Sequence, residues 1–274
     1  MTLEKFSALF NRAFRYAYSR KKSYFLFTVL SCVGLLFLFF QGVSLSQEAW
    51  LQNSLLFIPL FFGMGAVLAA QVLLSKFYKK EIEGETPTFR RTLFESGEAM
   101  LKISYLTIPL LLLYLLFWVF SSLFLLLHTI PFLGPFLTVV LAFVPFMLNL
   151  LSVVLVLITL MISFFIAPQI ALEGALDRRA LVMRLRSDVF LNLLFFLVPA
   201  AVVLFTYKVL FIAVRLTLGG AVLEGASLEA MLQAFFIMLP FLAVMTPVVN
   251  FFFNFAVEGY IVLQEECASR DHLR

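Results

Sequence analysis

Long apolar runs alternate with short polar or charged segments over the whole length of the chain. Each apolar run approaches or exceeds the ~18 residues that a helix needs to cross a bilayer. The pattern predicts an all-α fold, a polytopic integral membrane bundle in which residues 1–274 form a single domain. We expect six transmembrane helices, at about 24–42, 54–75, 103–127, 148–167, 189–214 and 231–257.

Amphipathic segments are predicted before the first, third and fifth spans. Residues 2–19 place their apolar side chains at helical spacing, and residues 88–101 do the same after the helix-start signal Thr86-Pro87. The third such segment, around 176–188, has a less regular charge pattern. Helices of this kind typically lie in the membrane interface with the apolar side down. The stripe of the first one consists of Leu3, Phe6, Phe10, Ala13, Phe14 and Ala17.

The charge-free run 136–167 allows two readings. A helix of that length would measure about 48 Å, which is well beyond a hydrocarbon core of about 30 Å. Residues 132–167 therefore form either one bent span or two short passes divided at Pro145. We prefer one span, because two passes would place the arginines of 178–186 outside the cell, against the positive-inside rule.

The basic residues also orient the chain. With six spans and both termini cytoplasmic, 18 of the 20 Lys and Arg residues face the cytoplasm, and only Lys208 and Arg215 face outward. The net charge of +4 therefore reports orientation in a lipid bilayer, and nucleic acid is not an expected partner. Arg20, Lys21 and Lys22 lie at the membrane edge, where we expect contacts with anionic lipid.

Composition agrees with this placement. Hydrophobic residues make up 63% of the chain and charged residues 13%, against about 25% charged in an ordinary soluble domain. The mean hydropathy is +1.04. The second span contains the small-residue pairs Gly65/Ala69 and Ala66/Ala70, which predict a close helix contact in lipid.

A threefold layout recurs along the chain. Each unit consists of a basic helix, a span, a turn and a second span, and the dipeptide Glu-Gly closes each even-numbered span, at Glu83-Gly84, Glu173-Gly174 and Glu258-Gly259. The layout is compatible with ancestral triplication and equally with simple recurrence.

The segment Ala167-Pro-Gln-Ile-Ala-Leu-Glu-Gly174, followed by Ala180 and Arg186-Ser187, is similar to a pattern of one loose bacterial superfamily. That superfamily comprises six-span inner-membrane proteins of unknown function and the membrane domain attached to some glycerophosphodiester phosphodiesterases. The N-terminal Asn11-Arg-Ala-Phe14 resembles its opening helix. The resemblance implies a bacterial cytoplasmic membrane and no chemistry, because the hydrolase domain is not in this sequence.

The sequence carries no nucleotide-binding, metalloprotease or nucleophile-elbow motif, so we expect no enzyme activity and no cofactor. The best polar candidate is a stripe on the sixth span, because Asn250, Asn254 and Glu258 recur every four residues and share one helix face. The stripe is either a polar intramembrane site or interhelical hydrogen bonding. Residues of other spans that could face it are Gln71, Asn149 and Asn192.

Three classes of function follow from these features. The sequence favours a multi-pass membrane protein without catalysis, acting in envelope upkeep or membrane assembly. The alternative is a transporter of small molecules or lipid with its polar site on the sixth span, since Pro240 and Pro247 could break that helix around a cavity. An intramembrane enzyme is least supported, because no nucleophile–base pair is present.

Overall fold

The computed structural model describes residues 3–44, 49–128, 143–177, 182, 189–218 and 228–271. All regular secondary structure in these ranges is helical. The short first helix is α1 (Leu3–Ala17). The long elements are α2 (Arg20–Ser44), α3 (Ala49–Ile82), α4 (Phe89–His128), the consecutive set α6 (Val144–Met161), η1 (Ile162–Ile166) and α7 (Ala167–Glu173), then α9 (Val189–Leu218) and α10 (Leu228–Asp271).

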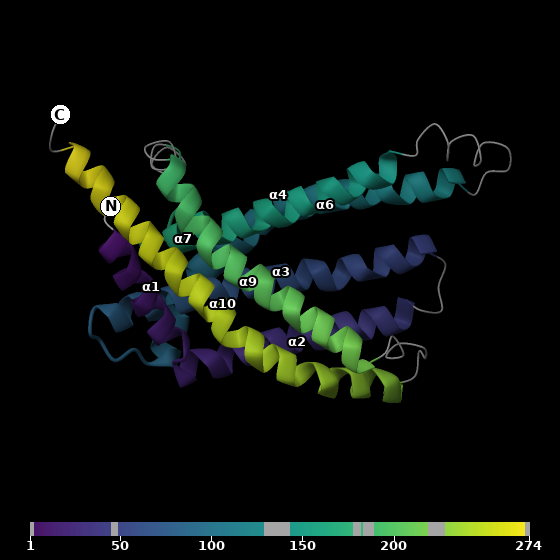
Figure 1. Ribbon diagram of the computed structural model, residues 1–274, viewed down its shortest axis with the longest axis horizontal. Helices are drawn as coiled ribbons and strands as arrows, with labels where there is room; N and C mark the ends of the chain where they lie inside the picture. The colour runs from purple at the N-terminus through teal and green to yellow at the C-terminus, as the bar shows by residue number, and fades with distance from the viewer. Residues whose placement is uncertain are drawn as a thin grey trace.

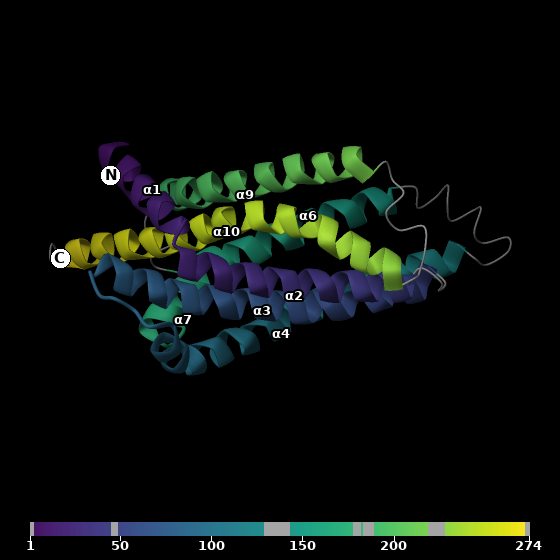
Figure 2. The ribbon, with the colours of Figure 1, turned by 90° about the horizontal axis from the view of Figure 1, so that it is seen from below.

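The long elements form an elongated bundle in which consecutive rods run in opposite directions (Figure 1). Helix α1 crosses the bundle at the end where α10 finishes, so the first and last helices meet there (Figure 2). In the part of the chain that the structure describes, five helical segments are long and apolar enough to cross a membrane, which supports an integral membrane protein. They are Arg20–Ser44, Ile58–Ile82, Val153–Glu173, Asn192–Val214 and Met231–Glu265, and α4 adds a shorter apolar stretch, Leu111–Leu123.

Two expected breaks are absent from the rods. The amphipathic segment 88–101 forms the first turns of α4, which continues into the apolar stretch without interruption. Helix α10 likewise passes through Pro240 and Pro247 as one helix. Each proline removes one backbone donor, but the helix continues through both positions.

The fourth rod extends further than the sequence indicates. The fourth span was predicted at about 148–167, yet the helix continues to Glu173 and is closed by Gly174, whose φ of 73° is left-handed. The π-helical turn η1 ends at Ile166, two residues before Pro168. Such a turn shifts the hydrogen-bond register, which accommodates a residue without an N–H. From residue 144 onward the rod has no interruption, and residues 132–142, on which the two readings differ, lie outside the described ranges.

The Glu-Gly dipeptides have two different roles. Gly84 and Gly174 adopt positive φ angles of 78° and 73° within two residues of a helix end, which is the ordinary conformation of a glycine that ends one. Gly259 lies inside α10 instead, so Glu258-Gly259 does not close the sixth rod. A Cβ at position 259 would meet Phe195 at 3.4 Å and Phe164 at 3.5 Å, so this glycine permits close aromatic packing.

Phenylalanine rings fill the contact between α1, α9 and α10. Phe10 meets Phe251 edge to face at a centroid distance of 5.0 Å, and Phe6 meets Phe195 at 5.4 Å and Phe255 at 5.7 Å in the same manner. These geometries match the attraction of a ring edge for a ring face. The apolar stripe of α1 therefore packs in large part on protein.

The close contact between α2 and α3 occurs at Gly63. A Cβ there would lie 2.9 Å from Val33 Cγ1, whereas one at Gly65 would meet nothing within 4 Å. Ala70 is buried, but Ala66 is exposed. The small-residue face predicted at Gly65/Ala69 and Ala66/Ala70 is therefore offset toward Gly63.

Candidate functional site: a polar network joining the first and last helices

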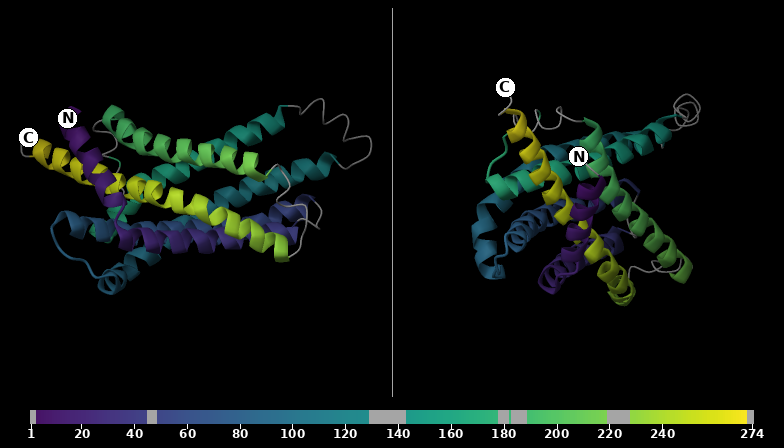
Figure 3. Two further views of the ribbon diagram at one scale, coloured as in Figure 1. Left: turned by 60° about the horizontal axis from the view of Figure 1, so that its bottom comes forward. Right: turned by 60° about the vertical axis from the view of Figure 1, so that its left-hand side comes forward.

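The predicted polar stripe on α10 is buried. Asn250, Asn254 and Glu258 have exposed fractions of 1%, 1% and 0%, respectively. Their four-residue spacing places them on the face of α10 that receives α1, and the two helices cross at this point (Figure 3). All three side chains contact residues from the N-terminal third of the chain.

The two asparagines bind the backbone at the end of α1. Asn254 Nδ2 donates to the Ala13 carbonyl at 3.1 Å, and Asn250 Nδ2 donates to the Ala17 carbonyl at 3.3 Å and to Ser23 Oγ at 3.4 Å. The last four carbonyls of a helix lack partners within it, so Asn250 provides a donor to such a group at Ala17, while Asn254 binds a carbonyl one turn earlier. Ala13 and Ala17 are 0% and 1% exposed, and their small side chains let α10 approach that backbone closely.

Glu258 accepts hydrogen bonds from two other helices. Arg12 of α1 binds the carboxylate with both Nε, 2.5 Å from Oε1, and Nη2, which contacts Oε2. The Tyr78 hydroxyl of α3 donates to Oε1 at 2.5 Å. The hydrogen bond to Glu258 raises the pKa of Arg12, which keeps the guanidinium charged. A buried carboxylate requires such a partner, because desolvation without one is costly.

A second ion pair lies beside the first. Lys22, which is 1% exposed, places Nζ 2.7 Å from Glu81 Oε2 and 3.5 Å from Asn254 Oδ1. The ammonium also lies over the rings of Tyr16 and Tyr78, at 5.7 Å and 4.9 Å from their centroids. Lys22 is therefore buried against α3 and the tyrosines, and the lipid contact expected of it stays a prediction.

Of the other predicted polar residues, Gln71 has its partners outside this network. Gln71 on α3 is paired with Ser163 on η1, donating to its carbonyl at 2.7 Å and accepting from its hydroxyl at 2.5 Å. Asn192 on α9 is buried at 4% exposure. Asn149 lies on α6, and its side chain is outside the described part of the structure. The structure thus separates Gln71 from the α10 stripe.

Sequence reasoning found the acceptors and amides but missed their partners. The missed residues are Arg12, Lys22, Tyr78 and Glu81 in their paired roles. A buried Glu258 demands a cation, but many basic residues lie near the same membrane edge, so composition could not select Arg12. The one available signal was that Arg12 and Lys22 flank the point where the amphipathic helix gives way to the first span.

The network balances its own charge. Two cations, Arg12 and Lys22, face two carboxylates, Glu258 and Glu81. Within the described residues no group of three or more His, Cys, Asp or Glu side chains is arranged to hold a metal ion. Buried atoms without a partner there include Asn250 Oδ1. The arrangement is suited to holding helices together. No family model, curated protein or solved structure matches the chain, so its function has to be argued from this geometry.

Proposed function

We propose that this chain is a non-catalytic protein of the bacterial cytoplasmic membrane, with six spans and both termini cytoplasmic, that acts in envelope upkeep or membrane assembly. α4 would supply the sixth span beside the five apolar segments. The positions of α1 and the end of α10 at one end of the bundle support termini on the same side (Figure 1). The superfamily resemblance of Ala167–Gly174 supports the bacterial membrane.

The observation that carries the proposal is the internal use of the α10 stripe. Asn250, Asn254 and Glu258 point their polar atoms at α1, α2 and α3, and among the described cavities none is lined by them. A transport site on the sixth span would need these groups to face cargo. Their contacts favour interhelical hydrogen bonding, worth on the order of 0.6 kcal/mol each in a membrane.

The variant Asn250→Leu tests this role. If the stripe holds helices together, the variant loses stability and membrane abundance. Cells that carry it then show the deletion phenotype only to the extent that protein has been lost. Abundance is measured by immunoblotting of membranes and stability by thermal unfolding in detergent. A variant that is fully stable and abundant, yet as defective as the deletion, contradicts the proposal and assigns a functional site to Asn250.

The topology is tested by cysteine accessibility. In a background without Cys32 and Cys267, a membrane-impermeant thiol reagent should label Ser46→Cys in intact cells but leave Ala180→Cys unlabelled until the membrane is permeabilised. Labelling of position 180 from outside would contradict six spans with cytoplasmic termini and favour a seventh crossing within 132–167.

A carrier of apolar molecules is the second candidate. A cavity of about 360 Å³ lies between α2, α3, α4, α6, α9 and α10, and its wall is almost wholly apolar. Its contributors from α10 are Val249, Phe252 and Phe253, not the polar stripe, so the cargo would be a hydrocarbon chain. The variant Val249→Trp should fill the cavity. If the protein carries apolar molecules, this variant should fail to restore the deletion strain. If the protein is a scaffold, the variant should restore the strain as well as the unchanged protein does at equal abundance.

A further inference from the structure

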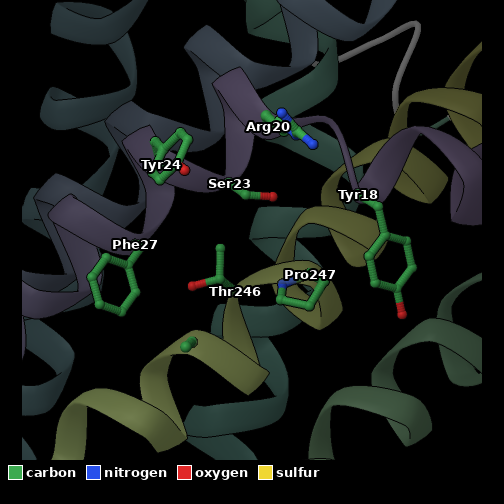
Figure 4. A pocket seen from close by; sticks show the side chains of 8 residues that line it. Tyr18, Arg20, Ser23, Tyr24, Phe27, Thr246 and Pro247 are labelled. Carbon is green, nitrogen blue, oxygen red and sulfur yellow. The ribbon is translucent and has the colours of Figure 1, made fainter.

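A groove opens where the end of α1 and the start of α2 meet the middle of α10. Its volume is about 520 Å³. Figure 4 shows Arg20, Ser23, Tyr24 and Phe27 of α2 on one side and Thr246 and Pro247 of α10 on the other, with Tyr18 beside them. Polar groups gather near the start of α2, and Phe27, Ala243 and Pro247 make the remainder apolar. The groove is therefore amphipathic along its length.

The depth of the groove matches the lipid headgroup region. Arg20 begins a helix that is apolar enough to span a membrane, so the cation lies at the edge of the hydrocarbon. Tyr18 and Tyr24 are 59% and 72% exposed at the same level. Exposed tyrosines at the end of an apolar helix are typical of the membrane–water interface.

The groove carries positive charge without an internal counter-ion. Arg20 is exposed, and among the described residues it has no ion pair and no carboxylate lines the groove. Its neighbour Lys22 is neutralised by Glu81 instead. A guanidinium offers a planar pair of donors that suits a phosphate, so the charge complement of this groove is an anion at headgroup depth.

Ser23 has a hydroxyl proton to offer in the groove. Its Oγ accepts a hydrogen bond from Asn250 Nδ2 at 3.4 Å, so the buried amide occupies one acceptor position of the oxygen. A hydroxyl has one proton in addition to its acceptor positions, and among the described residues Ser23 Oγ donates no hydrogen bond. Asn250 thus holds Ser23 from behind, which leaves the hydroxyl proton available to a phosphate oxygen.

The apolar part of the groove is formed by a flat piece of α10. Ala243 and Pro247 lie one turn apart and present little side-chain bulk, while the Thr246 hydroxyl donates to the Leu242 carbonyl at 2.7 Å within its own helix. Phe27 closes the opposite side. An acyl chain would lie along this surface below a headgroup held at Arg20.

We propose that this groove binds an anionic phospholipid, with the phosphodiester at Arg20 and Ser23 and one acyl chain along Phe27, Ala243 and Pro247. The inference rests on the proposed membrane placement and deepens the expectation of anionic lipid at Arg20. It is independent of the cellular role, because lipid binding is measured on purified protein.

The test is native mass spectrometry of the full chain in detergent, titrated with phosphatidylglycerol or phosphatidylcholine. Arg20→Gln should weaken phosphatidylglycerol binding about fivefold, the effect of one basic residue at an anionic surface. Lys21→Gln is the matched control, because it removes the same charge from the next, exposed position outside the groove. Its effect should stay below about twofold.

A steric variant tests the acyl-chain half separately. Ala243→Phe should obstruct the groove and reduce binding of phosphatidylglycerol, whereas Val244→Phe, on the adjacent exposed residue outside the groove, should not. Arg20 is exposed, so Arg20→Gln carries the test if Ala243→Phe fails to fold.

Four results would overturn the proposal. Equal losses from Arg20→Gln and Lys21→Gln would indicate diffuse surface charge. Displacement of the lipid by excess inorganic phosphate would indicate a free-anion site. Equal binding of phosphatidylcholine, or no effect of Ala243→Phe in a folded protein, would indicate adventitious lipid adhesion. Each of these outcomes leaves the topology experiment and the Asn250→Leu experiment unaffected.

Discussion

Removal of Arg12 should expose the energetic importance of the contact between the first and last helices. The Glu258 carboxylate is fully buried and accepts hydrogen bonds from Arg12 and from the Tyr78 hydroxyl. In Arg12→Gln it loses the charged partner and keeps the Tyr78 hydroxyl. Breaking a buried ion pair on one side typically costs about 3–5 kcal/mol. Arg12 is 42% exposed, so water already screens part of the attraction. We therefore expect a loss of about 2–3 kcal/mol.

A double-mutant cycle separates the pair from its surroundings. Glu258→Gln leaves Arg12 able to reach water and keeps an acceptor for Tyr78, so its cost should be about 1 kcal/mol. The double variant Arg12→Gln/Glu258→Gln should be little worse than Glu258→Gln, which gives a coupling energy of about 2 kcal/mol. Unfolding is followed by circular dichroism during titration with a denaturing detergent at neutral pH.

The control is Arg15→Gln, which removes the same charge from an exposed position one turn along α1. If Arg12→Gln costs no more than this control, or if the two substitutions of the cycle are additive, the ion pair is not what holds α1. The cycle should also be unaffected by moderately alkaline pH. The pKa of Arg12 is raised by Glu258, so its contribution is complete below the ordinary arginine pKa and is lost only as pH rises through the still higher folded value.

Two further predictions concern helix packing and pH. Gly63→Val should cost about 1–3 kcal/mol by overpacking against Val33, while Gly65→Val, facing open space, should be close to neutral in the same unfolding assay. Hydrogen bonds from Lys80 and Arg91 lower the pKa of Glu95, so this acid stabilises the fold above its ordinary pKa of about 4.5, and the effect is lost as pH falls through the lower folded value. Glu95→Gln should therefore flatten the acid limb of the stability–pH curve, and an unchanged limb would contradict this.

Hydropathy predicted the rods well because a bilayer imposes a length on every apolar helix. Rod ends were harder to place. The helix passes Pro168 because the η1 turn changes register there, and no composition signal announces a π turn. The start of α4 was read as a separate helix because its amphipathic pattern changes to a fully apolar one near residue 102, although the backbone hydrogen bonding does not change.

The polar stripe could be predicted as a face but not as a contact. Periodicity places Asn250, Asn254 and Glu258 together on one face. The partners that α1 and α2 supply to them, however, lie 227 to 246 residues away in the sequence. Pairing over such distances depends on how the rods are arranged, which a local pattern does not contain. The same limit explains Lys22, whose burial follows from α3 and not from its neighbours in sequence.

The contacts at this end of the bundle follow one physical scheme. Each unit of the threefold layout opens with an amphipathic segment. In all three of these opening segments, a backbone carbonyl accepts a hydrogen bond from a side-chain nitrogen of an even-numbered rod. Asn254 binds the Ala13 carbonyl at 3.1 Å, Lys76 binds that of Glu95 at 2.7 Å, and Gln169 binds that of Asp177 at 3.3 Å. In the latter two cases the partners are close in sequence, so the contact can form as soon as the turn does.

The first opening helix differs, because its rod is the last one in the chain. An isolated helix as short as α1 is marginal in water, and its partners Asn250, Asn254 and Glu258 are synthesised only after five rods are complete. α1 can therefore dock on α10 only after the last rod has been synthesised. This order explains why the joint contains an ion pair and amide bonds in addition to the phenylalanine rings. Lipid offers Phe6 and Phe10 an apolar surface anywhere on the bundle, whereas Glu258 and the two asparagines provide acceptors and donors at one place only.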